Sequence, residues 1–334
     1  MRFAKLTLTT RRFPGLVATG VAVLALSACS SSSLPTLTGF AAVRDQAART
    51  ESAASDRATQ LAEVATDCAS CSAALRAVAS ASHERLEALG GLWDPWGGTP
   101  PEGASAPAAV SEAPTDVTAF VAWLARTATR DLEIAADTNR TSADEARTLS
   151  AAALGRYASA VTIAQAYGID LDAGLDQALL VNDRVNAASR QGVQTWSIDL
   201  FDAPGISASF APSGKDLASS QELSSAVATW DCTASTLPQA QVSAGTLSDA
   251  YAVSGELLAR ADVALRAGAA DTRTPRCTLG FLDAPSLASN LLAADSAMLA
   301  SNSSDVRAAG ASAALADIQQ WAPRTSLPAL IGTR

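Results

Sequence analysis

Two cysteines, Cys68 and Cys71, have a spacing that can do chemistry. A C-x-x-C pair at the first turn of a helix is a redox-active arrangement, because the positive end of the helix dipole stabilises the thiolate. Redox pairs of this kind usually follow a strand of a βαβ unit, whereas the residues before Cys68 have a helical pattern. We therefore interpret the pair as a structural disulfide. A thiol oxidoreductase centre and a metal site completed by His83 remain the alternatives.

The first 28 residues have the layout of a secretory signal, with basic residues, the apolar run Leu16–Leu26 and small residues before a cleavage point. This apolar run is too short to span about 30 Å of hydrocarbon as a helix. The sequence Leu26-Ser27-Ala28-Cys29 resembles the lipobox of bacterial lipoproteins. The resemblance implies cleavage before Cys29, a diacylglyceryl thioether on its sulfur and a further acyl chain, such as palmitate, on its amine. An ordinary signal-peptidase site is the alternative, and Arg11-Arg12 leaves twin-arginine export open.

These features predict a lipid-anchored protein on the extracytoplasmic face of the cell membrane. Residues 29–39 are rich in serine and predict a flexible tether. Without the first 28 residues the chain carries 20 basic and 33 acidic residues. An acidic body of this kind gains no attraction from anionic lipid and lacks the basic face of a nucleic-acid binder. The expected partners are the membrane, through Cys29, and an envelope protein.

Four cysteines remain beside Cys29, namely Cys68, Cys71, Cys232 and Cys277. An even number in an oxidising compartment predicts two disulfides, with three possible connectivities. The spacing does not decide among them. We favour crossed or mixed bonds, because cysteines three apart reach disulfide geometry with difficulty unless they lie at the first turn of a helix.

A glycine-framed turn places two tryptophans three residues apart, in the sequence Trp93-Asp94-Pro95-Trp96. Tryptophan offers a large contact area at low entropic cost, so the turn is a candidate binding surface formed by Trp93, Asp94 and Trp96. The alternative interpretation is a plug over one end of a helical bundle, and we favour the plug.

We identify no catalytic residue, metal site or cofactor site in the sequence. The single histidine, His83, lies at the edge of an apolar helical stripe and has no recognisable nucleophile or orienting partner. A ferritin-type di-iron site needs Glu-x-x-His on each of two helices, which one histidine cannot supply. Phosphate-binding glycine loops and G-x-S-x-G elbows are also missing from the sequence.

Alanine-rich segments with helical periodicity predict an all-α fold made of two packed bundles. The expected N-terminal helical domain covers residues 40–190. Its helices begin near Phe40, after Asp67, after Thr115 and after Ser142, where Ser142 and Glu145 fit a capping box. Gly90-Gly91 and Gly168 predict helix ends, and a short fifth helix is expected to start at Asp170 or Asp172 and to run through Val185.

The helical pattern lapses over residues 191–216, which we interpret as a connection. The expected C-terminal domain covers 217–331, with helices near 217–234, 244–269, 285–300 and 304–321. Pro238, Pro275 and Pro285 are expected to lie outside these helices. One fused bundle is the alternative to two domains.

The C-terminal domain resembles the uncharacterised ferritin-like domain of actinobacterial lipoproteins. The similarity lies in Ala226–Cys232, in Ala284–Ala288 and in the closing Leu327–Leu330. It implies a four-helix bundle, and the missing Glu-x-x-His pairs imply that an ancestral metal site has been lost.

The sequence therefore predicts a membrane-anchored lipoprotein that acts as a non-catalytic binding or scaffold module of the bacterial envelope. A degenerate ferritin-like metal-handling protein and an envelope thiol oxidoreductase are the alternatives.

Overall fold

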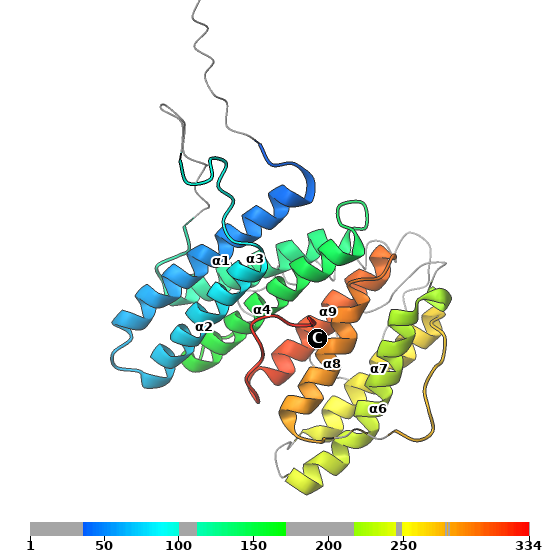
Figure 1. The fold of residues 1–334 in the computed structure, drawn as a ribbon. Coiled ribbons are helices and arrows are strands. Elements are labelled where there is room, and N and C mark those ends of the chain that lie inside the picture. The colour runs from blue at the N-terminus through cyan, green and yellow to red at the C-terminus, as the bar shows by residue number, and fades with distance from the viewer. Residues whose placement is uncertain are drawn as a thin grey trace, which may run out of the picture.

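The computed structural model describes residues 36–99, 112–171, 217–244, 249–277, 279 and 281–333, and among these residues it contains helices and no strand. The predicted all-α fold is confirmed. Figure 1 shows the helices as two neighbouring groups, α1–α4 and α6–α9. The bounds are α1 Gly39–Val64, α2 Ala69–Ala88, α3 Val117–Ala136, α4 Ala143–Tyr167, α6 Gln221–Ala244, α7 Ala250–Ala267, α8 Ala284–Met298 and α9 Ser304–Trp321, with a 3₁₀ turn at Leu217–Ser219.

Local signals in the sequence set several of the helix ends. The capping box of α4 forms as predicted, because the Ser142 side chain accepts from the Glu145 amide and the Glu145 carboxylate accepts from the Ser142 amide. Gly168 ends α4 in the left-handed conformation, at φ 66°. The predicted caps Asp67 and Thr115 are wrong by one residue. Cys68 and Asp116 take those positions, because their side chains accept from the amides three residues ahead.

The prediction that Pro238 and Pro285 lie outside helices is wrong. Pro285 lies in the first turn of α8, where a missing N–H leaves no hydrogen bond unmade. Pro238 lies within α6 and cannot donate to the carbonyl oxygen of Ala234. The Ser254 hydroxyl of α7 donates to that oxygen over 2.7 Å, so a neighbouring helix replaces the lost donor.

The first group packs α1 against α2, α3 against α4 and α2 against α4. The second group packs α6 against α7, α8 against α9 and α6 against α8. Alanines fill much of both interiors and keep the helix axes close, whereas Trp230 and Trp321 supply the bulk in the second group.

The two groups share a hydrophobic cluster, in which Leu292 of α8 and Ile318 of α9 join Leu124 of α3 and Leu154 of α4. The buried Arg307 of α9 also donates to carbonyl oxygens at the end of α3 and in the turn after it. The helices of 40–171 and 217–331 are therefore packed together through α3, α4, α8 and α9. The predicted connection 191–216 and residues 172–185 of the predicted fifth helix lie outside the described residues.

The predicted signal, residues 1–28, the lipidation residue Cys29 and most of the tether also lie outside the described residues. Among the helices that the structure describes, none combines the length and hydrophobicity needed to cross a membrane.

Candidate functional site

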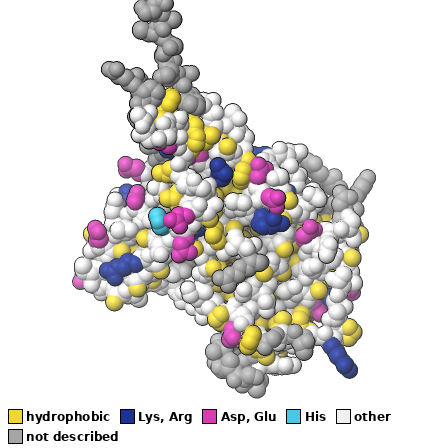
Figure 2. Space-filling view, in the orientation of Figure 1, with side chains coloured by type: hydrophobic (Ala, Val, Ile, Leu, Met, Phe, Trp, Pro, Cys, Tyr) yellow, Lys and Arg dark blue, Asp and Glu magenta, His cyan; other side chains and the backbone are white. Residues whose placement is uncertain are grey.

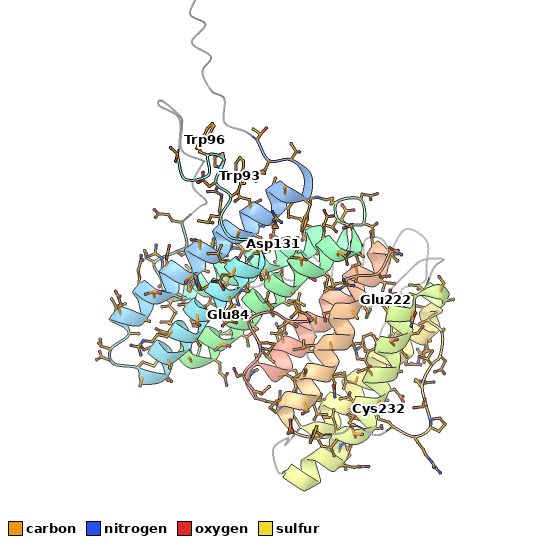
Figure 3. The ribbon with its side chains drawn as sticks, in the orientation of Figure 1. Glu84, Trp93, Trp96, Asp131, Glu222 and Cys232 are labelled. Carbon is orange, nitrogen blue, oxygen red and sulfur yellow. A yellow bond between two sulfur atoms is a disulfide. The ribbon has the colours of Figure 1, made fainter. Side chains whose placement is uncertain are left out.

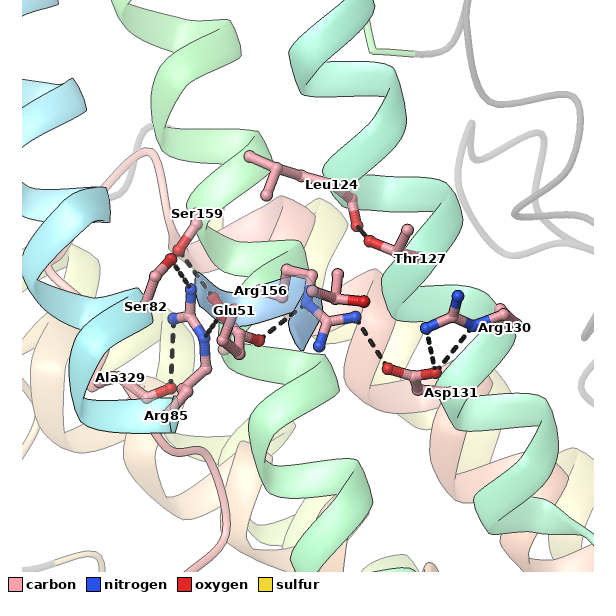
Figure 4. A network of polar contacts seen from close by, with 12 residues as sticks. Glu51, Ser82, Arg85, Leu124, Thr127, Arg130, Asp131, Arg156, Ser159 and Ala329 are labelled. Carbon is pink, nitrogen blue, oxygen red and sulfur yellow. Dashed lines mark hydrogen bonds and ion pairs between the residues drawn. The ribbon is translucent and has the colours of Figure 1, made fainter. Parts of the chain in front are cut away.

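The centre of the first helical group holds a buried ion-pair network with one residue from each of its four helices (Figure 4). Glu51 of α1 accepts from Arg85 Nε of α2 over 2.9 Å and from Arg156 Nε of α4 over 2.8 Å. Arg156 Nη1 donates to Asp131 of α3 over 2.8 Å. Glu51, Arg85 and Arg156 are fully buried. Asp131 also accepts from the partly exposed Arg130 of α3 over 2.7 Å. We call the four buried residues, two arginines and two carboxylates, the N-terminal network.

Burial and ion pairing shift the pKa of each arginine in opposite directions. Burial is the largest influence on Arg85 and lowers its pKa, although Glu51 counters the shift. Burial also disfavours charge on Arg156, but Glu51 and Asp131 together outweigh it, so the pKa of Arg156 is raised. An arginine keeps its proton under ordinary conditions, so both guanidinium groups stay charged and depend on their carboxylates.

The second helical group has a corresponding arrangement, again with one residue from each helix. Arg260 of α7 holds both carboxylate oxygens of Asp317 of α9 through two hydrogen bonds of 3.0 Å. Asp295 of α8 lies 3.8 Å from the same guanidinium and accepts from Trp230 Nε1 of α6 over 2.8 Å. The Arg260 guanidinium lies 5.4 Å from the Trp230 ring centroid. We call these four residues the C-terminal network.

In the C-terminal network one guanidinium faces two buried carboxylates, so positive and negative groups are not matched one to one. Burial raises the pKa of Asp295 well above its ordinary value, and the neighbouring Asp317 raises it further. The half-buried Glu256 on α7 also has a raised pKa, chiefly through burial. The buried position and the second carboxylate thus both disfavour a negative charge on Asp295.

In both networks an arginine takes the position between carboxylates that a bound cation would occupy in a helical bundle. Arg156 bridges Glu51 and Asp131, and Arg260 lies between Asp295 and Asp317. Among the residues that the structure describes, no group of three or more histidines, cysteines or acids is arranged to hold a metal ion. Each network links the four helices of its group through hydrogen bonds and ion pairs.

The C-terminal segment, residues 322–333, lies between the two helical groups, as the red tail in Figure 1 shows. The Ile331 amide donates to Ala151 O of α4 over 3.2 Å, and Arg85 reaches Ala329 O at 3.5 Å. A Cβ on Gly155 would lie 1.8 Å from that same Ala329 oxygen, so only glycine allows this approach. A pocket of about 380 Å³ remains between α2, α4 and residues 322–329, with the Arg85 side chain in its wall.

The four cysteines pair locally, as Cys68–Cys71 and Cys232–Cys277. The expectation of crossed or mixed bonds is therefore wrong. Cys68 is the N-cap of α2 and Cys71 lies in its first turn, which is the one place on a helix where this spacing allows a bond. Cys232, labelled in Figure 3, lies within α6, and its bond ties the loop after α7 to that helix.

The tryptophan turn is fastened to α1 rather than projecting freely. The Trp93 amide donates to Asp45 over 2.9 Å, and Arg49 donates to Trp93 O over 3.4 Å. Asp94 is exposed and accepts from the Trp96 amide over 2.8 Å, which closes the turn on itself. Figure 3 shows both tryptophans at the end of the group where α1 begins. Trp93 and Trp96 are half-buried there, so the structure leaves both the plug and the binding surface open.

His83 lies on the surface beside acidic side chains (Figure 2). Its side chain is 65% exposed, and Nε2 lies 3.5 Å from Glu87, one turn along α2. The histidine is thus more exposed than its place at the edge of the apolar stripe suggests. It is too far from Cys68 along α2 to share a metal site with the cysteines, because fifteen residues of helix span about 22 Å.

Sequence reasoning missed both buried networks. The signal was present in the pattern, because Glu51 occupies a core position on the α1 face that also carries Ala47, Ala54 and Ala58. Arg156 likewise interrupts the buried run of α4 between Ala153 and Ala160. A charged residue at a core position of a helix predicts a buried partner of opposite charge.

Comparisons with known proteins add no relative: no family model matches the chain, and no curated protein or solved structure matches it.

Proposed function

We propose that the protein is a lipid-anchored module of the bacterial cell envelope that binds or scaffolds a partner and whose helical core carries out no catalysis. The observation that carries this proposal is the occupation of both bundle interiors by paired arginines. A bundle that works as an enzyme keeps open ligand positions on facing helices. Here Glu51, Asp131 and Asp317 are hydrogen-bonded to guanidinium groups. Asp295 is hydrogen-bonded to Trp230, which together with the other pairs supports a structural interior.

The anchor part of the proposal rests on the sequence Leu26-Ser27-Ala28-Cys29 and the basic, apolar segment before it. Two or three acyl chains contribute about 0.8 kcal/mol per buried methylene, which is enough for durable attachment to a membrane. The acidic surface adds no attraction to anionic lipid, so the acyl chains alone would hold the protein in place.

The ferritin-like relation of helices α6–α9 is part of the same proposal. Four helices that each contribute one polar side chain to a common centre agree with a ferritin-like bundle. The residues do not fit a di-iron centre, because Trp230 and Arg260 supply neither a carboxylate nor an imidazole and histidine is missing from the set. A lost metal site replaced by an ion pair accounts for this composition.

Metal analysis of protein purified without chelator tests the proposal. We expect less than one tenth of an equivalent of iron or manganese per chain, before and after incubation with either ion under reducing conditions. Stoichiometric iron or manganese would favour the degenerate ferritin-like metal-handling protein and contradict the scaffold. The variant Cys29→Ala, expressed beside the natural chain, should leave the membrane fraction without loss of folding.

A further inference from the structure

We infer that Cys68–Cys71 is an exchangeable disulfide that accepts two electrons from a dithiol of a partner protein. This activity would lie at the start of α2 rather than at the buried ion-pair networks, and it goes beyond the proposed scaffold role. Four features of the described residues carry it: the position of the pair on α2, the different exposure of the two cysteines, the different polar surroundings of their sulfurs, and the exposed turn around Cys68.

The position favours charge on Cys68. This residue is the N-cap of α2, a helix of 20 residues, and its sulfur accepts from the Cys71 amide over 3.2 Å. The Ser70 hydroxyl lies 3.4 Å from the same sulfur. An amide donor, a hydroxyl and the positive end of a helix dipole all stabilise a thiolate at this atom.

Cys71 has the opposite surroundings. It is 3% exposed, and its sulfur lies 3.4 Å from the carbonyl oxygen of Ala166, near the C-terminal end of α4. A carbonyl oxygen and the negative end of a helix dipole disfavour a thiolate, but they suit a thiol, which donates a hydrogen bond. The two sulfurs are therefore distinguished as an outer atom that partners can attack and an inner atom that keeps its proton when reduced.

The turn between α1 and α2 leaves room for a partner chain. Cys68 is partly exposed, and Val64, Thr66, Asp67 and Ala69 around it are exposed. Figure 1 shows this turn at the opposite end of α1 from Gly39, where the predicted tether joins the body. The 26 residues of α1 span about 39 Å, so the turn projects away from the anchored end.

The exchange takes place in two steps. A partner thiolate bonds to Cys68 Sγ, the Cys68–Cys71 bond breaks, and Cys71 leaves with the electron pair and takes up a proton. The second partner thiol then loses its proton and attacks the partner sulfur of this mixed disulfide, which expels Cys68 as a thiolate. The partner loses two electrons and becomes a disulfide, while Cys68 and Cys71 become a dithiol.

The second disulfide of the chain, Cys232–Cys277, serves as an internal control. The folded, oxidised full-length chain would be mixed with less than one equivalent of a peptide carrying two reduced cysteines, and free thiols would then be alkylated and mapped by mass spectrometry. We expect the peptide to become oxidised and the alkyl label to be at least tenfold higher on Cys68 and Cys71 than on Cys232 and Cys277. An unoxidised peptide, equal labelling of both pairs or preferential labelling of Cys232 and Cys277 would overturn the inference.

Two single variants test the direction of attack. Cys71→Ser leaves Cys68 as the free outer thiol, and Cys68→Ser leaves the buried Cys71. With oxidised glutathione as the probe, Cys71→Ser should form a mixed disulfide at least tenfold faster than Cys68→Ser, and circular dichroism should show both variants folded. Equal rates or a faster Cys68→Ser would contradict the assignment of Cys68 as the attacked sulfur. If a variant does not fold, the mapping of the natural chain decides alone.

Discussion

The substitution Glu51→Gln tests the energetic role of the N-terminal network most severely. Glutamine keeps the size of the side chain but removes the charge that Arg85 and Arg156 both contact. Arg156 keeps Asp131, whereas Arg85 keeps only the neutral acceptors Ser82 Oγ and Ala329 O. Removing one partner of a buried ion pair costs about 3–5 kcal/mol, because the remaining charge stays buried.

The expected loss would be measured by urea unfolding followed by circular dichroism. A thermal scan should show the midpoint falling by about 6–20 °C, at about 2–4 °C per kcal/mol for a large domain. The matched control is Glu87→Gln, because Glu87 is 71% exposed and its partner His83 is also at the surface. A surface pair contributes about 0–1 kcal/mol, so this variant should unfold almost like the natural chain.

A double variant separates the charge from the packing. Glu51→Gln with Arg85→Met removes the carboxylate together with one of its two cations, so about half of the loss should be recovered. A free energy of unfolding for Glu51→Gln within about 1 kcal/mol of that of the natural chain would show that Glu51 does not stabilise the buried arginines. A double variant no more stable than the single one would show the same.

Three further predictions test other parts of the structure. The pKa of Asp295 is raised on folding, so its contribution to the free energy of unfolding is present below about pH 3.9 and is lost as the pH rises through the folded pKa. Across a pH series, the urea midpoint of the natural chain should therefore fall more with rising pH than the midpoint of Asp295→Asn. Parallel curves for the two proteins would contradict this. Gly155→Ala would place a Cβ against the C-terminal segment and should lower the free energy of unfolding by about 1–3 kcal/mol. Gly255→Ala on α7 meets nothing within 4 Å and should raise it by about 0.5–1 kcal/mol. The melting temperatures of the two variants should therefore shift in opposite directions. Replacing Cys232 and Cys277 by serine opens a loop with a separation of 45 residues. This should lower the free energy of unfolding by about 4 kcal/mol in the chain-entropy model. An unchanged urea midpoint would contradict the prediction.

The helices could be predicted because their signals are local. The Ser142 and Glu145 capping box and the glycine stop at Gly168 lie within a few residues of the ends that they define. The failures have a non-local cause. Pro238 stays inside α6 because Ser254, from the next helix, replaces the missing donor, and no local rule anticipates that contact.

The candidate site was harder to predict for the same reason. Glu51, Arg85, Asp131 and Arg156 come from four helices, and only their packing shows which charges meet. The disulfide connectivity could not be predicted from the sequence either. Cysteines three residues apart can bond here because the helix begins at Cys68 and not one residue earlier.

The proposed envelope module requires lipid on Cys29, so the decisive measurement is the intact mass of the natural product extracted from membranes. We expect a chain that begins at Cys29 and carries the mass of a diacylglyceryl group with one further acyl chain or none. A chain with an unmodified thiol at Cys29, or one cleaved elsewhere, would contradict it.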